Sequence, residues 1–224
     1  MPSSPSLTRS LGSGAVLLNT EPLVASVDSF CDGLADDGAS RDLVEAARER
    51  LGHSKVSGPR TGFTSPGRTS THAWLAHDVT PRTRALAERI AKVVLRPLST
   101  AEAFQVVRYG RGGEYRAHFD AYDLGTERGR RTCRGRGQRL LTAIVYLNDV
   151  EAGGATSFPR LGLSVQARAG RLLVFENCGR SSTVRHGDAL HAGEPVLAGE
   201  KWIANLWFRE RAPTGLNARD AATR

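Results

Sequence analysis

The sequence predicts a mainly β fold, namely a double-stranded β-helix (jelly roll) supported by helices near the N-terminus. Two observations predict this class. Apolar residues recur at helical spacing in two segments before residue 102, whereas from residue 102 onward they form short runs typical of strands. Turn signals separate those runs, among them Asn148-Asp149 and Gly153-Gly154.

The N-terminal part accounts for the helices. Residues 21–30 are expected to form a short opening strand. Ser40 can cap a helix over residues 40–52, and a Thr-Pro pair begins a second helix over residues 80–97. Residues 53–72 are rich in Gly, Ser, Thr and Pro and are expected to form a loop.

Longer strands are expected in the C-terminal part, with shorter pieces between them. Several short strands joined by turns are typical of a double-sheet jelly roll. The predicted strands cover residues 104–109, 115–120, 140–147, 170–175 and 201–209.

We expect a single domain over residues 21–209, with its jelly-roll catalytic core at about 102–209. A chain of 224 residues is long enough for one domain with a sizeable core. Residues 1–20 are expected to be a disordered leader and residues 210–224 a tail. No long apolar stretch occurs, so we expect no membrane span.

The composition also bears on the partners and the location of the protein. The net charge is +8, yet only three residues are lysine, and an arginine-rich chain can reflect the base composition of its coding sequence. We therefore expect no nucleic-acid partner. The three cysteines form no zinc pattern and no disulfide framework, which favours reduced thiols and a cytoplasmic location.

One basic cluster is local, at residues 127–139, where glycines separate the arginines. Three interpretations stay open. The cluster is a solvated flexible loop, a substrate-facing lid that attracts an anionic group, or a nucleic-acid contact. The cluster has no aromatic residue to stack bases, which argues against the third.

His118 and Asp120 are the most informative residues. Side chains two apart on a strand point to the same face, so an imidazole and a carboxylate would meet at one point. His191 can add a second imidazole, and His186, five residues before it, is the alternative. Two histidines and one carboxylate on one face of a metal are the ligand set of non-heme Fe(II) oxygenases.

Lys201, ten residues after His191, begins the last predicted strand. A lysine on the inward face of a jelly roll is costly unless it meets a counter-charge, and a carboxylate-bearing co-substrate would supply one. Thr156 can add a hydroxyl and Tyr109 a phenol. Trp202 alternates off the Lys201 face and is expected in the core. The residues that share the face of Lys201 are Ile203, Asn205, Trp207 and Arg209.

The chain resembles the prolyl 4-hydroxylase type of Fe(II)- and 2-oxoglutarate-dependent dioxygenases over roughly residues 22–209. The His-x-Asp triplet alone is a weak signal, whereas the ordered set with a lysine ten residues after the distal histidine is specific. The matching pieces are Arg68-Thr-Ser70, Gln105-Val-Val-Arg-Tyr109, Tyr115, His118-Phe-Asp120, Arg139-Leu-Leu-Thr142, Tyr146-Leu-Asn-Asp149, Gly153-Gly-Ala-Thr-Ser-Phe158, His191-Ala-Gly-Glu-Pro-Val196, Gly199-Glu-Lys-Trp202 and Trp207.

The resemblance implies a cupin-like jelly roll that uses Fe(II), 2-oxoglutarate and O2, with ascorbate as a candidate reductant. It implies hydroxylation of an unactivated C–H bond, with succinate and carbon dioxide as co-products. The implied iron ligands are His118, Asp120 and His191; the implied 2-oxoglutarate contacts are Lys201, Thr156, Tyr109 and Trp207; the implied substrate-side residues are Arg139, Arg209, Tyr115 and Arg68.

Two departures from the family pattern concern the substrate. Arg209 stands where the family usually has a histidine, and it is expected to point into the cavity mouth. The segment between Asp120 and Arg139 is unusually rich in arginine. An arginine beside the substrate favours a carboxylate or phosphate partner. We therefore expect an amino acid or a small molecule derived from one as the substrate.

Three alternatives stay open at this point: a peptidyl-prolyl or other protein hydroxylase, a jelly-roll metalloenzyme such as an isomerase that never uses 2-oxoglutarate, and a silent binding module. Lys201 and Thr156 argue against the metalloenzyme, and the intact ligand set argues against the binding module. The sequence does not determine the oligomeric state.

Overall fold

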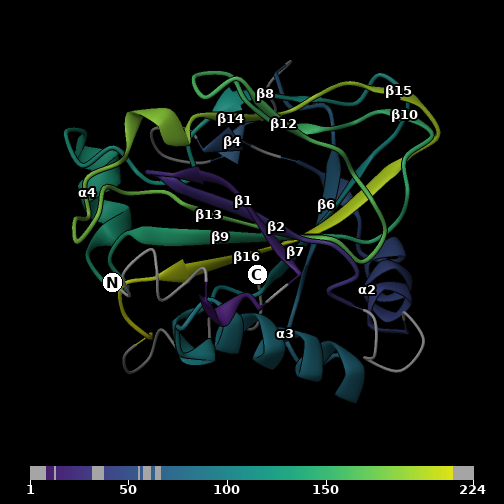
Figure 1. Cartoon of the computed structure of the whole chain (residues 1–224), viewed down its shortest axis with the longest axis horizontal. Coiled ribbons are helices and arrows are strands. Elements are labelled where there is room, and N and C mark those ends of the chain that lie inside the picture. The colour runs from purple at the N-terminus through teal and green to yellow at the C-terminus, as the bar shows by residue number, and fades with distance from the viewer. Residues whose placement is uncertain are drawn as a thin grey trace.

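A computed structural model describes residues 9–12, 14–31, 38–54, 56–57, 62–63 and 67–213. The described chain forms three layers, seen in Figure 1 as helices below, a large sheet in the middle and small sheets above. The mainly β, jelly-roll prediction is confirmed. No helix in the described ranges is long and apolar enough to cross a membrane.

The large sheet has eight antiparallel strands, and its centre is formed by strands from the C-terminal half of the chain. In spatial order it contains β1 (Ala15–Thr20), β2 (Leu23–Val27), β13 (Leu172–Glu176), β9 (Arg139–Tyr146), β16 (Lys201–Arg209), β7 (Phe104–Tyr109), β6 (Thr71–Leu75) and β3 (Gly52–His53).

The smaller sheets lie over one face of this layer. The four-stranded one contains β12 (Leu163–Val165), β11 (Thr156–Phe158), β14 (His191–Gly193) and β8 (Tyr115–His118). Two-stranded ribbons pair β10 (Ala152–Gly153) with β15 (Val196–Ala198) and β4 (Val56–Ser57) with β5 (Gly62–Phe63).

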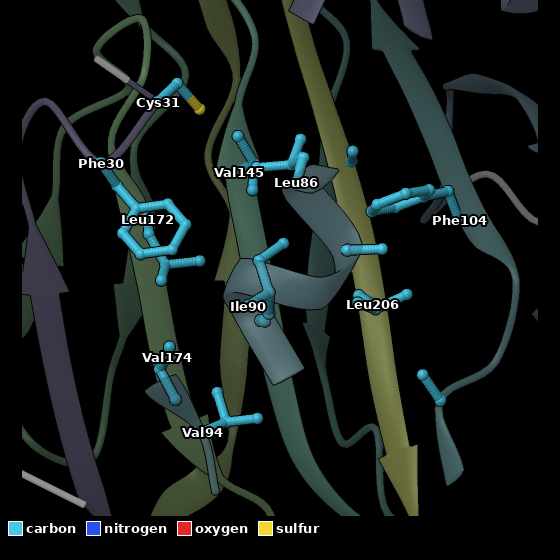
Figure 2. Packing of buried hydrophobic residues seen from close by; sticks show 14 of the residues in the cluster. Phe30, Cys31, Leu86, Ile90, Val94, Phe104, Val145, Leu172, Val174 and Leu206 are labelled. Carbon is cyan, nitrogen blue, oxygen red and sulfur yellow. The ribbon is translucent and has the colours of Figure 1, made fainter. Parts of the chain in front are cut away.

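Helices cover the other face of the large sheet. They are α2 (Gly38–Arg48) and α3 (Pro81–Val93), while α4 (Glu127–Cys133) lies at one end of the molecule and short 3-10 turns occur at Leu98–Thr100 and Gly187–Ala189. Thr80 caps α3 as predicted, in a reciprocal capping box with Thr83. Leu86 and Ile90 of α3 are fully buried against the sheet, as Figure 2 shows. Truncating either to alanine is expected to cost about 2–5 kcal/mol.

Strand β16 shows how alternation divides the core. Its even-numbered residues, from Trp202 to Phe208, pack with the helices, and Trp202 is 2% exposed there, as predicted. Ile203 belongs to the second cluster, between the two sheets. Lys201, Asn205 and Trp207, on the same face as Ile203, line a cavity.

The structure differs from the sequence prediction in five places. Ser40, which was expected to cap the first helix, lies inside α2, because that helix already begins at Gly38. The expected leader includes β1, which pairs with β2, and the expected loop at 53–72 contains short strands and the start of β6. The arginine-rich segment contains α4, capped by Thr126. Strand β8 ends at His118 rather than Asp120. Strands of two or three residues and caps inside a basic run leave no clear periodicity in a sequence.

Candidate metal and co-substrate site

The three predicted metal ligands converge at one point. His118 of β8 and His191 of β14 are register partners. Nε2 of His118 lies 3.8 Å from Oδ1 of Asp120, and Nε2 of His191 lies 3.6 Å from Oδ2 of the same carboxylate. One ligand atom from each residue lies within 4.8 Å of the others. The alternative, His186, instead accepts a hydrogen bond from the backbone of Asp188 in a turn.

Backbone carbonyls fix the orientation of both imidazoles. Nδ1 of His118 lies 2.9 Å from the carbonyl of Arg116, and Nδ1 of His191 lies 3.1 Å from that of Ala189. A carbonyl can only accept, so each Nδ1 carries a proton and Nε2 is the ring nitrogen that faces the other ligands. This is the second-shell arrangement typical of metal-binding histidines.

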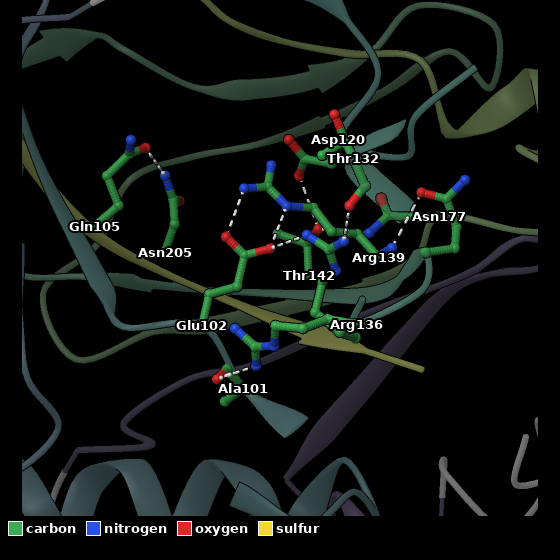
Figure 3. A network of polar contacts seen from close by, with 12 residues as sticks. Ala101, Glu102, Gln105, Asp120, Thr132, Arg136, Arg139, Thr142, Asn177 and Asn205 are labelled. Carbon is green, nitrogen blue, oxygen red and sulfur yellow. Dashed lines mark hydrogen bonds and ion pairs between the residues drawn. The ribbon is translucent and has the colours of Figure 1, made fainter. Parts of the chain in front are cut away.

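Asp120 lies just beyond β8 and is held from the large sheet. The Thr142 hydroxyl donates to Oδ2 of Asp120 at 2.7 Å, and the Asn177 amide donates to the same hydroxyl at 2.8 Å. Figure 3 shows this chain of contacts. The aspartate is aimed by a hydrogen bond from β9, whereas strand alternation was the reason that the sequence offered.

The protonation states suit a cation. Burial and the neighbouring His191 lower the pKa of His118 to about 3, so its imidazole is neutral at pH 7. Burial raises the pKa of Asp120, but the adjacent His191 and His118 outweigh it and hold that pKa at about 2. A neutral His118, an ionised Asp120 and the imidazole of His191 bring their ligand atoms to one point, and this ligand set fits Fe(II).

Lys201 is a buried cation with no ion-pair partner in the described part of the chain. It is 1% exposed, and no carboxylate of the described residues lies within ion-pair distance of its Nζ. Burial lowers its pKa to about 8. A buried charge of this kind is stabilised by an anionic ligand, so the pocket fits a co-substrate carboxylate.

Two tyrosines face this ammonium group, and one of them contacts the predicted co-substrate residue Thr156. Nζ of Lys201 lies 5.4 Å from the ring centre of Tyr109 and 5.6 Å from that of Tyr146. Tyr146 donates its hydroxyl proton to Oγ1 of Thr156 at 2.8 Å. Gly153 lies three residues before this threonine and has a φ of +72°. A Cβ at this position would meet the Pro195 carbonyl at 2.3 Å, so the turn requires glycine.

The two arginines predicted on the substrate side are held by one largely buried carboxylate. Glu102 accepts from Nε and Nη2 of Arg139 at 2.7 Å each, and from Nη1 of Arg209 at 3.0 Å. The Arg139 guanidinium also lies 3.8 Å from the ring centre of Trp207, and both residues line the cavity. Arg139 is therefore presented to the cavity in a fixed orientation (Figure 3).

The prediction that Arg209 points into the cavity mouth is wrong. Its side chain is 7% exposed and is not part of the cavity lining. It donates to the carbonyls of Thr132 and Gly137, and Arg136 donates to the carbonyl of Ala101. The arginine-rich segment is therefore anchored to the body of the protein, which a solvated flexible loop would not be.

The remaining predicted residues lie on the opposite wall. Tyr115 stacks on His118 with ring centres 3.6 Å apart, and the Arg68 guanidinium lies 4.5 Å from the Tyr115 ring centre. Arg68 donates to Oε1 of Gln105 at 3.2 Å. Burial raises the pKa of Tyr115, which keeps its phenol protonated.

All of the site residues predicted from the sequence, except Arg209, line one cavity of about 1570 Å³. It extends from α4, past the three ligands, to the start of β3. Sequence reasoning missed the side chains that support it: Glu102, Thr142, Tyr146 and Asn177. Thr142 and Tyr146 stand inside the quoted motifs, but Glu102 and Asn177 carry no sequence signal because only the fold brings them to the site.

Comparisons with known proteins agree with this geometry. A model of the 2OG-Fe(II) oxygenase superfamily matches residues 104–209. A candidate prolyl 4-hydroxylase of Acanthamoeba polyphaga mimivirus is 33% identical over 208 residues, covering 90% of this chain and 84% of that protein. Prolyl 4-hydroxylase subunit alpha-2 of Gallus gallus is 34% identical over 186 residues, covering 81% of this chain.

The chain spans about a third of the length of that chicken subunit. Among solved structures, a viral collagen prolyl hydroxylase from Paramecium Bursaria Chlorella virus-1, in complex with 2OG, superposes with a TM-score of 0.63 at 26% identity. That superposition covers 83% of this chain and 95% of the viral one.

Proposed function

Because the chain belongs to the prolyl 4-hydroxylase type of the 2OG-Fe(II) oxygenase superfamily, we propose that it hydroxylates proline residues within a polypeptide. The protein is a 2-oxoglutarate-dependent iron dioxygenase. Fe(II), 2-oxoglutarate and dioxygen are its cofactor and co-substrates, and ascorbate as a reductant stays a prediction.

The observation that carries the proposal is the extent of the cavity. Its volume of about 1570 Å³ exceeds the roughly 300–1000 Å³ typical of small-molecule sites. Its wall crosses five neighbouring strands, from β9 to β3. A free amino acid would fill a small part of this space, whereas an extended segment of polypeptide suits its length. The relatives named above are prolyl hydroxylases or, for the mimivirus protein, a candidate one. The protein from Paramecium Bursaria Chlorella virus-1 is a collagen prolyl hydroxylase.

The small-molecule substrate that the sequence favoured loses its main support. That expectation depended on Arg139 and Arg209 being available to bind a substrate carboxylate. Glu102 already accepts hydrogen bonds from both guanidinium groups. Arg139 still faces the cavity, but Glu102 occupies its Nε and Nη2 donors, so the paired hydrogen bonds that a substrate carboxylate would need are already taken and the remaining N–H groups suit a carbonyl acceptor such as a peptide oxygen.

The protein's residues would divide the work as follows. His118, Asp120 and His191 would hold the iron, and Lys201 would pair with the distal carboxylate of 2-oxoglutarate. When bound, iron and 2-oxoglutarate supply the oxidising chemistry that activates dioxygen and leaves succinate and carbon dioxide.

Nearby side chains would align both partners. The Thr156–Tyr146 pair would position the co-substrate beside the lysine, and Trp207 lines the same cavity against Arg139. Tyr115 and Arg139 would orient the peptide, since they line the cavity beside the ligands.

A matched substrate comparison tests the proposal. The full-length protein, loaded with Fe(II), is incubated with 2-oxoglutarate and either short proline-rich peptides, the same peptides with alanine in place of proline, or free L-proline. We expect substrate-dependent succinate release with the proline peptides alone, and a mass gain of one oxygen atom on those peptides. Turnover with free amino acids but with none of the peptides would contradict the proposal.

A further inference from the structure

The cavity wall carries more positive charge than the proposed chemistry uses. Its lining includes three carboxylates, and each has a partner or a role. Glu102 binds Arg139, Asp120 is a metal ligand, and Asp123 lies 3.6 Å from the Arg185 guanidinium. The arginines of the lining other than Arg139 are Arg50, Arg68, Arg116, Arg128, Arg136 and Arg185.

Two of these arginines, Arg128 and Arg50, have neither an ion pair nor a hydrogen bond at the guanidinium group among the described residues, whereas Arg136 donates to backbone carbonyls. Arg128 is half-buried in the first turn of α4, and Arg50 is exposed just before β3. Neither guanidinium makes a hydrogen bond to the described part of the protein, whereas Arg116 pairs with Glu114 at 3.2 Å. Both unpaired guanidiniums border the cavity, so they are available to a bound molecule.

Arg185 places a third positive charge beside the metal ligands. Its guanidinium lies 4.2 Å from the ring centre of Phe119, the residue between His118 and Asp120. The Asp123 carboxylate balances it only in part, because that carboxylate is half exposed and 3.6 Å away. The α4 end of the cavity therefore has a net positive charge, supplied by Arg128 and Arg185.

The two ends of the cavity are separated by the width of several strands. From β9 to β3 the large sheet makes four steps between neighbouring strands, or roughly 19 Å at about 4.8 Å per step. An extended peptide rises about 3.3 Å per residue, so roughly six residues connect the ends. Thr142 of β9 supports Asp120, so the metal site lies near the α4 end and Arg50 lies at the far one.

We propose that the polypeptide substrate is acidic, with carboxylate side chains on both sides of the hydroxylated proline. Arg128 and Arg185 bind the carboxylate close to the proline, and Arg50 binds one about four to six residues away. This inference rests on the proposed function, and it adds the charge that the substrate carries. Guanidinium groups bind carboxylates in paired hydrogen bonds, which gives register as well as affinity.

The aromatic residues of the wall favour a peptide over a single-stranded nucleic acid. Nucleic-acid grooves of this kind combine positive charge with exposed rings on which bases stack. At the metal end of the wall the rings are already covered, since Arg185 lies over Phe119, Arg139 over Trp207, and Tyr115 between Arg68 and His118. A carboxylate needs only the guanidinium groups.

Three peptides of equal length test the preference. Each has one central proline, with glutamate, glutamine or lysine at two positions, one close to the proline and one about five residues from it on the other side. We expect kcat/KM for hydroxylation to be about tenfold higher for the glutamate peptide than for the glutamine peptide, and lowest for the lysine peptide, with differences that shrink at high salt. Equal values for all three would overturn the acidic preference while leaving the peptidyl function intact.

Charge reversal identifies the residues. R128E and R50E should each reduce the glutamate preference at least about threefold. R134E is the matched control, since Arg134 is exposed in the same segment as Arg128 but lies outside the cavity lining. Melting curves check that each variant folds. An R134E effect as large as that of R128E would mean that overall charge, rather than these contacts, sets the preference.

A binding measurement keeps the test independent of turnover. Fluorescence anisotropy of the labelled peptides, with the full chain loaded with Mn(II) and 2-oxoglutarate, should show tighter binding of the glutamate peptide. Preferential binding without hydroxylation would support the charge preference and contradict the proposed function. Displacement by single-stranded oligothymidylate, but not by unlabelled glutamate peptide, would overturn the inference in favour of nucleic acid.

Discussion

The Thr142 hydroxyl donates a hydrogen bond to Oδ2 of Asp120 at 2.7 Å, and this contact connects the metal site to the large sheet. The same hydroxyl accepts from Asn177 at 2.8 Å, so its proton is directed to the aspartate. The carboxylate is thereby oriented by a neutral residue that is not itself a ligand.

T142V should weaken metal binding about 10–100-fold, because valine keeps the shape and removes the hydrogen bond that orients Asp120. Calorimetric titration of the metal-free protein with Mn(II) measures this directly. T142S keeps the hydroxyl and serves as the matched control. Equal Mn(II) affinity in T142V and the wild type would show that the carboxylate is oriented by other contacts.

The affinity for 2-oxoglutarate should fall above pH 8. Burial lowers the pKa of Lys201 to about 8, so raising the pH through that value removes the positive charge that faces the co-substrate. We expect kcat/KM for 2-oxoglutarate to drop by about a factor of ten per pH unit above 8. K201A should raise the KM at pH 7 and abolish this alkaline limb. A K201A variant with an unchanged KM would mean that the co-substrate pocket is assigned wrongly.

E102Q should reduce stability at neutral pH and much less in acid. Burial raises the pKa of Glu102, but Arg139 and Arg209 outweigh it and hold the pKa at about 2, against 4.5 for a free glutamate. The carboxylate therefore contributes its full stability above pH 4.5, roughly 3 kcal/mol, and loses it as the pH falls toward 2. Urea unfolding of both proteins from pH 7 to pH 3 should show the gap between them narrowing, and a constant gap would refute this account.

R209H should act on the arginine-rich segment more than on the metal. The substitution removes hydrogen bonds to the carbonyls of Thr132 and Gly137 and one of the contacts to Glu102. We expect a loss of about 1–3 kcal/mol and faster hydrogen exchange across α4, with Mn(II) affinity retained. R111H, at an exposed arginine in a turn outside this segment, is the control. Unchanged exchange in α4 would show that Arg209 does not anchor it.

The chemistry of the site was largely predictable from the sequence. A histidine, an aspartate, a second histidine and a lysine at fixed spacing identify the ligand set because each residue type has few other uses inside a jelly roll. The alternation of side chains between the two faces of β16 was equally predictable, since nine consecutive residues are enough to establish a period of two.

The prediction for the Arg209 side chain failed because its direction depends on a partner far away in the sequence. The sequence shows that Arg209 follows Trp207 on the inward face, but not that a buried carboxylate at position 102 binds its guanidinium. Glu102 lies in a connection with no periodicity, 107 residues from that partner. The direction of a long side chain is decided by such distant partners, so the substrate side was predicted less well than the iron side.

The metal ligands belong to different layers of the protein. Both histidines lie on the four-stranded sheet, whereas the aspartate is fastened to β9 of the eight-stranded sheet. An ion bound by all three ligands would crosslink the two sheets of the sandwich. Chelation should therefore let the halves separate along this seam first, and iron supply would set the lifetime of the folded enzyme as well as its rate.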